Sequence, residues 1–132
     1  MMTEPEVVQT LREYFESLFP KVCPNCNRRF NTLREYILVT QRIGLTRSYD
    51  ADLGEWKTTR PIGSVAQANC PCGSTLALST ESMALPQRLT LLEWVRVETH
   101  RRGVSPSELL EHLRDAVRRQ VLDEPIEGND VA

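Results

Sequence analysis

Apolar residues recur at helical spacing over the first twenty residues of the chain. They form a single stripe along one helix face: Val7, Val8, Leu11, Tyr14, Phe15, Leu18 and Phe19. Thr3 and Glu6 have the spacing of a capping box, and Pro5 stands where a helix tolerates a missing N–H. Pro20 ends the pattern. The spacing predicts an amphipathic helix that packs on the segment after it or docks on a partner.

Between Cys23 and Cys72 the pattern changes to short β-prone runs separated by turn residues. Three of these runs have the composition of strands: Tyr36–Thr40, Ser64–Ala68 and Thr75–Ser79. Asp50–Gly54 has the composition of a turn. Together they predict a small antiparallel meander. Such a sheet has few core positions of its own, so we expect flanking helices and a metal to stabilise it.

The last third of the chain is again helical in pattern. One predicted helix runs from Pro86 to about Arg102, and its apolar stripe is wide enough for burial on two sides. Gly103 has the position of a C-terminal cap. A second helix begins with the same signals as the first one: Ser105, Pro106 and Glu108. Residues 123–132 have no periodicity, and we expect them to be flexible.

These elements predict an α+β fold. It consists of an N-terminal amphipathic helix (1–20), a small antiparallel β domain (21–85), a C-terminal helical hairpin (86–122) and an acidic tail (123–132). At 132 residues the chain is one small domain or a compact domain with appendages. A domain of this size buries little apolar surface, so a bound metal would contribute meaningfully to its stability.

The charge is unevenly distributed. The chain has 16 basic and 18 acidic residues, a net charge of −2, so it is not built as a bulk polyanion binder. Both ends are acidic, whereas residues 21–60 hold eight basic against four acidic residues. Five arginines in or near this region could contact phosphates or pair with carboxylates: Arg28, Arg29, Arg34, Arg42 and Arg47.

Hydropathy and the start of the chain address localisation. No apolar run approaches the roughly 20 residues that cross a bilayer. The acidic start lacks the basic flank and apolar stretch of a signal peptide. We therefore predict a cytoplasmic protein without membrane contact, and the preference for arginine over lysine is typical of a bacterial source.

The four cysteines form two close pairs, Cys23-Pro24-Asn25-Cys26 and Cys70-Pro71-Cys72-Gly73. In a reducing compartment such pairs bind metal more often than they form disulfides. Four thiolates are the tetrahedral set that zinc prefers in structural sites. Asn27 and Gly73, directly after the pairs, tolerate the left-handed backbone that tight turns demand. The predicted metal ligands are Cys23, Cys26, Cys70 and Cys72.

Over residues 23–80 this arrangement resembles the zinc-ribbon family, in which two knuckles at the ends of β-hairpins hold one zinc. The resemblance implies Zn²⁺ as the cofactor. The second pair is Cys-x-Cys, one residue shorter than the usual spacing. Iron or an iron–sulfur cluster uses the same four thiolates, and an exported chain would form disulfides. A Cys-x-Cys with a distant Cys-x-x-Cys also resembles the zinc centre of redox-regulated chaperones.

Residues 76–120 resemble a ribbon-helix-helix repressor module. The resemblance is carried by the turn Gly103-Val104-Ser105-Pro106-Ser107-Glu108-Leu109-Leu110. It implies a dimer in which the strands of two chains pair and enter the DNA major groove. The N-terminus of the second helix would then bind a phosphate of the DNA.

A saturated Cys₄ site leaves no open position for water or substrate, which favours a structural metal. The sequence shows no phosphate loop, nucleophile elbow or Ser/His/Asp spacing, so we predict no enzymatic activity. His100 and His112 could approach each other across a helical hairpin, or lie separately at the surface.

The predicted function is that of a small bacterial zinc-binding regulatory or adaptor protein that acts through contacts with a protein partner. Apolar faces on three helices also favour a homodimer. Two alternatives remain: a dimeric DNA-binding transcriptional regulator, and a thiol-based redox sensor or iron–sulfur protein.

Overall fold

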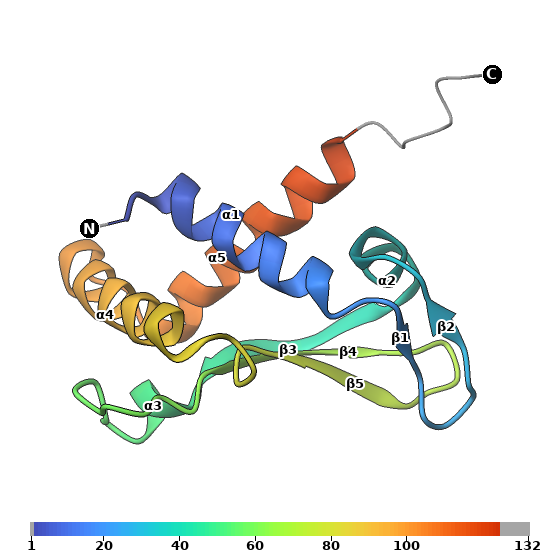
Figure 1. Ribbon diagram of the computed structural model, residues 1–132, viewed down its shortest axis with the longest axis horizontal. Helices are drawn as coiled ribbons and strands as arrows, with labels where there is room; N and C mark the ends of the chain where they lie inside the picture. The colour runs from blue at the N-terminus through green and yellow to red at the C-terminus, as the bar shows by residue number, and fades with distance from the viewer. Residues whose placement is uncertain (1, 125–132) are drawn as a thin grey trace.

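The computed structural model describes residues 2–124 and has the predicted α+β architecture (Figure 1). The helices are α1 (Glu4–Ser17), α2 (Leu33–Val39), α3 (Tyr49–Asp52), α4 (Leu85–Arg102) and α5 (Pro106–Asp123). The strands are β1 (Lys21–Val22), β2 (Arg29–Phe30), β3 (Gln41–Ser48), β4 (Ser64–Asn69) and β5 (Thr75–Ser79). The flexible tail is predicted for residues 123–132, and residues 125–132 lie outside the described part of the chain. Asp123 is the last residue of α5.

The strands form two separate antiparallel sheets. β3, β4 and β5 make a three-stranded meander in that order, and β1 pairs only with β2 in a short hairpin. The strands predicted at 64–68 and 75–79 are confirmed as β4 and β5, with Ala66 opposite Leu78 and Ala68 opposite Leu76. The register between β3 and β4 shifts between Ile43 and Arg47, where Gly44 has a φ of +63°.

The strand predicted at Tyr36–Thr40 is wrong, because residues Leu33–Val39 form the helix α2 instead. The β-branched and aromatic composition that favoured a strand is overruled by a local helix start. Thr32 is an N-cap whose hydroxyl accepts a hydrogen bond from the Glu35 N–H at 3.1 Å. The next residue after the helix, Thr40, is extended and begins the turn into β3.

Aromatic packing is the second reason for this helix. Leu33 and Tyr36 lie one turn apart and both are buried. The Tyr36 ring packs edge-on against Phe30 and Phe19, with ring centroids 5.4 and 5.5 Å apart. A strand would have placed Leu33 and Tyr36 on opposite faces, so only the helix buries both against these rings.

The strand β3 was not predicted, since its sequence is polar and contains a glycine. Most of Gln41–Ser48 is exposed, and only Thr46 and Ser48 are buried. Its pairing with β4 and its packing against α5 hold it in place. The predicted turn at Asp50–Gly54 is in part a single helical turn, α3, followed by Gly54 with a φ of +74°.

Helices α1, α4 and α5 lie on one side of the three-stranded sheet, with α1 and α5 crossing over it (Figure 1). Their apolar faces and the inner face of the sheet form the core, which includes Val7, Leu109, Leu113 and Phe30. Among residues 2–124 no helix combines the length and apolar character needed to traverse a bilayer.

The predicted helix ends are confirmed. Thr3 and Glu6 form the full capping box of α1, and the Ser105 hydroxyl accepts from the Glu108 N–H at the start of α5. Gly103 ends α4 in the left-handed conformation with a φ of +66°. These local signals lie within a few residues of the ends that they define.

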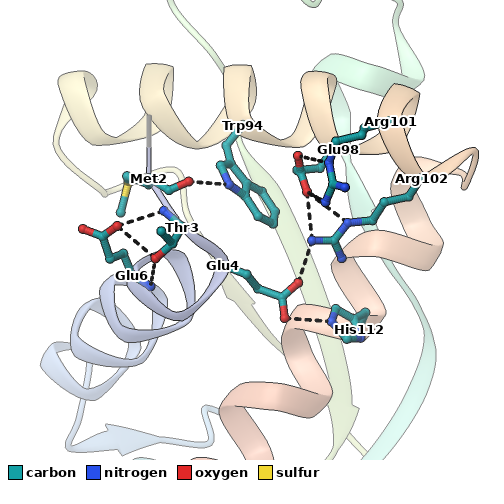
Figure 2. Close-up of polar contacts among 9 residues, drawn as sticks. All are labelled: Met2, Thr3, Glu4, Glu6, Trp94, Glu98, Arg101, Arg102 and His112. Atoms are coloured by element: carbon teal, nitrogen blue, oxygen red, sulfur yellow. Dashed lines mark hydrogen bonds and ion pairs between the residues drawn. The ribbon is translucent and has the colours of Figure 1, made fainter.

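Polar contacts hold the start of α1 against α4 and α5 (Figure 2). The Trp94 indole donates to the carbonyl of Met2 at 2.9 Å. Glu4 forms an ion pair with Arg102 at 2.8 Å, and its other carboxylate oxygen lies at hydrogen-bond distance, 3.1 Å, from a ring nitrogen of His112. His100 is exposed in the last turn of α4, and the contacts within the described part of the chain include none between it and His112. The two histidines therefore lie separately.

Candidate metal centre

The first cysteine pair lies in the turn of the β1–β2 hairpin. The Cys23 N–H donates to the Arg28 carbonyl at 2.9 Å, and the Asn27 N–H donates to the Cys23 carbonyl at 2.9 Å. Asn27 is left-handed, with a φ of +64°. Asparagine tolerates this conformation better than most side chains, so the residue after the pair permits the chain to reverse within the turn.

The second cysteine pair forms the turn between β4 and β5. The Cys70 N–H donates to the Ser74 carbonyl, and the Gly73 N–H donates to the Cys70 carbonyl, both at 2.8 Å. Gly73 has a φ of +96°, which L side chains rarely adopt. The Cys-x-Cys spacing is thus accommodated by a tight turn with its own backbone hydrogen bonds.

The two turns bring the four cysteine sulfurs together, all within 4.8 Å of one another. The Sγ atoms of Cys23 and Cys72 are 3.7 Å apart, as are those of Cys26 and Cys70. A tetrahedron with zinc–sulfur bonds of about 2.3 Å has edges of about 3.8 Å. A disulfide would require about 2.05 Å, so the cysteines are free and spaced as metal ligands.

The site is half inside the core and half at the surface. Cys23 and Cys70 are buried within the apolar core, whereas Cys26 and Cys72 are exposed. The first cysteine of each pair therefore packs against the body of the protein, and the second faces outward. A bound metal would be anchored to the core on one side and shielded by the two turns on the other.

Hydrogen bonds to sulfur favour ionisation at one edge of the site. The Asn25 side chain donates to Cys72 Sγ at 3.5 Å and, with Ser74, lowers the pKa of Cys72 to about 5. The Cys72 N–H also lowers the pKa of Cys70, but burial and the adjacent thiols outweigh it and raise that pKa to about 12. Four thiolates this close repel one another, so a cation is needed for all of them to ionise.

Sequence reasoning placed the four cysteines in one site but missed Asn25 and Ser74 as hydrogen-bond donors to sulfur. The only signal for them was their position within or beside the cysteine pairs. Donors of this kind tune the basicity of metal ligands and orient them. The structure brings all four predicted cysteines together, while binding of a particular metal stays a prediction.

The five arginines near the first cysteine pair do not form a common free surface. Three of them are engaged within the chain: Arg34 with carbonyls at the end of α5, Arg42 with Asp115 and Arg47 with Asp52. Arg28 and Arg29 are exposed beside the first cysteine turn. For Arg34, Arg42 and Arg47, pairing within the chain therefore describes the structure better than free contact with phosphates does.

Comparison with known proteins finds no matching family, no similar curated protein and no similar solved structure. The likeness to a zinc ribbon therefore rests on the cysteine cluster and its geometry. In the segment that resembles a ribbon-helix-helix module, β5 pairs along one edge with β4 of the same chain.

Proposed function

We propose that this protein is a small zinc-binding regulatory or adaptor protein whose Cys₄ site is structural and whose surfaces contact a protein partner. The proposal is carried by one observation. Four thiols from two separate hairpins converge at tetrahedral spacing, and two of them belong to the core.

A structural role follows from the ligand set. Four thiolates complete a tetrahedral zinc and leave no position for water or substrate, which argues against hydrolytic chemistry at this site. The metal would join the β1–β2 hairpin, which pairs with no other strand, to the end of the three-stranded sheet. The free energy of metal binding would then add to the stability of the folded state.

The support for a protein partner is a group of exposed apolar side chains in one segment of the chain, residues 49–62. Tyr49, Leu53 and Ile62, on α3 and the loop after it, are large apolar side chains exposed by 43%, 66% and 46%. Asp50 holds this loop closed by accepting from the N–H groups of Ile62 and Gly63. Contiguous apolar groups at a surface are typical of contact sites, and we expect these three side chains to form one.

The first experiment is elemental analysis of protein purified without added metal, read beside its absorbance spectrum. We expect about one zinc per chain in a colourless protein. Cys70→Ser should lose the zinc and become less stable, whereas Ala77→Ser, on an exposed position of the same β-hairpin, should keep both properties. Iron with visible absorbance, or unchanged stability without metal, would contradict the proposal.

Light scattering and crosslinking test whether these exposed apolar side chains contact a second copy of the chain or another protein. A dimer that Leu53→Glu converts to a monomer identifies the partner as a second copy. With a monomer, a photo-crosslinker at Leu53 should capture a specific protein that the same group at the exposed Arg119 does not. Equal capture at both positions would contradict contact through this surface.

Redox sensing is a second candidate, favoured by the sulfur pairs that approach across the two turns and by the exposure of Cys26 and Cys72. Each hydrogen peroxide would oxidise two thiols to one disulfide and yield two waters. A sensor releases zinc at mild peroxide concentrations and rebinds it after thiol reduction. Retention of zinc under the same conditions would exclude this function.

A further inference from the structure

Two adjoining cavities lie between the helices and the sheet, in a region lined by none of the cysteines. The first, of about 110 Å³, is lined by α5 and the inner face of the sheet, with further contributions from α1 and α2. The second, of about 220 Å³, is lined by residues of α1 and α4 and by Met83. Leu11 and Leu91 line both cavities, so these two side chains form their shared boundary.

Small side chains on β4 account for the first cavity. Ser64, Ala66 and Ala68 alternate along the strand and all line the space beneath α5. Leu78, opposite Ala66 on β5, and Leu113 on α5 complete an apolar wall without filling it. The cavity is partly open to solvent, and its volume is well above the roughly 10–15 Å³ that one water needs, so it has room for a small ligand.

Three cations line this largely apolar cavity, and one of them, Arg114, lacks a full set of hydrogen bonds. Arg114 Nη2 donates to the Gln67 carbonyl at 2.9 Å, but its Nη1 is buried and has no hydrogen-bond partner within residues 2–124. Glu111 Oε2 lies 3.9 Å from Nη1, too far for a hydrogen bond, and accepts from Thr46 instead. Burial, and then the charge of Arg42, lower the pKa of Arg114.

The surroundings of Arg114 favour an anion. Arg42 and Arg118 line the same cavity, and Arg42 is already paired with Asp115. The buried Tyr36 hydroxyl also lacks a partner among the described residues and is close enough to be affected by the charge of Arg114. The guanidinium of Arg114 is partly buried and its Nη1 makes no hydrogen bond within the described residues; a carboxylate would satisfy it best, because its geometry matches the planar donors.

We propose that these cavities bind a small aliphatic carboxylate, with its carboxylate group on Arg114 and its chain along Leu11 and Leu91 toward the second cavity. The apolar walls suit a hydrocarbon chain, and the two volumes together reach the lower end of the roughly 300–1,000 Å³ typical of ligand pockets. The proposal does not depend on the metal site, and metal content should be the same with and without ligand.

Octanoate is the probe for this site, titrated into the metal-loaded full chain by calorimetry and by NMR. We expect one octanoate per chain, with shifts at residues of α5 and β4, and binding of octanol at least about tenfold weaker because it lacks the anion. Arg114→Met should weaken octanoate by about tenfold or more, while Arg119→Met, exposed on the same helix, should leave it unchanged.

Ala66→Leu tests the cavity separately from the charge. The larger side chain should occupy the space beneath α5 and abolish octanoate binding without loss of the helical circular dichroism signal. Three results would overturn the proposal: no binding up to about 1 mM octanoate, octanol binding as tightly as octanoate, or unchanged binding in both Arg114→Met and Ala66→Leu.

Discussion

At the scale of single residues, Asp50 organises the longest loop of the described chain. Its side chain is 3% exposed, and its two oxygens accept from the N–H groups of Ile62 and Gly63, each at 2.9 Å. These bonds connect α3 to the start of β4 across twelve and thirteen residues. A buried carboxylate that serves two backbone donors is difficult to replace.

Asp50→Ala should lower the free energy of unfolding by about 3 kcal/mol, because two backbone N–H groups lose their acceptor. Asp52→Ala is the matched control two residues away. Asp52 forms only an exposed ion pair with Arg47, so its loss should cost less than about 1 kcal/mol. Urea unfolding measures both variants, and equal effects would show that the loop does not depend on Asp50.

Gly63 is required for a second, steric reason. It has a φ of +116°, and a Cβ there would lie 2.6 Å from the hydroxyl of Thr80, which is only 1% exposed. Gly63→Ala should therefore cost about 3 kcal/mol or more in thermal or urea unfolding. Gly54 also has a positive φ, but a Cβ there would meet no atom within 4 Å. Gly54→Ala should therefore cost only about 1–2 kcal/mol.

At the scale of elements, the ends of helices are held by side chains from distant parts of the chain. Arg34, on α2, donates from Nη1 to the carbonyls of Val121, Leu122 and Glu124 at 2.9–3.2 Å. The last carbonyls of a helix have no partner inside it, and a cation there also interacts favourably with the helix dipole. The unpredicted helix α2 thus secures the end of α5.

Arg34→Met should destabilise the protein by about 1–2 kcal/mol and increase hydrogen exchange in the last turn of α5, because three carbonyls lose their donor. Arg29→Met is the control, since Arg29 is exposed and donates only to the nearby Asn31. If exchange rises equally in both variants, Arg34 is not a cap of α5.

The stability that the junction of α1 and α4 contributes to the fold should depend on pH. Arg101, with Arg102, holds the pKa of Glu98 at about 2, below its ordinary value of 4.5 (Figure 2). The folded state therefore binds this proton less tightly than the unfolded state does. The contribution of Glu98 to stability is complete above about pH 4.5 and is lost as the pH falls toward 2.

Unfolding of Glu98→Gln and the wild type at several pH values measures this contribution. The wild type should be more stable at neutral pH, and the difference should shrink as the pH falls below about 4.5. Ala77→Ser, an exposed position without a titrating side chain, should differ from the wild type by the same amount at every pH. A difference that is independent of pH would contradict the assignment to Glu98.

At the scale of the whole molecule, the cysteine site joins a weak element to a strong one. β1 and β2 pair over two residues each, and no other strand pairs with them. The three-stranded sheet, in contrast, is covered by α1 and α5 (Figure 1). The four sulfurs connect these two parts at their ends.

Removal of metal by a chelator should therefore release the β1–β2 hairpin before the rest of the fold. Hydrogen exchange followed by mass spectrometry should show loss of protection over residues 21–32, while α5 retains its protection. Zinc added back should restore the protected state. Simultaneous loss of protection in both regions would show that the metal supports the whole core directly.

Much of this architecture could be predicted from the sequence. The helices α1, α4 and α5 carry clear caps, such as the Thr3 capping box and the left-handed Gly103. The strands β4 and β5 lie where their composition predicts them, and the tight turns after Cys26 and Cys72 use Asn27 and Gly73 as expected. Each of these signals acts within a few residues, so a single sequence contains it.

Signals between residues close together in the chain were enough to predict the helical ends, the two cysteine turns and the set of four thiols. Three features became visible only in the folded chain: residues 33–39 are helical, Gln41–Ser48 forms a strand, and small side chains on β4 leave a cavity beside Arg114. These features depend on packing against α5, Phe19 and Phe30. Packing between segments far apart in the chain outweighs local propensity, because burial contributes more free energy than the preferences of individual residues.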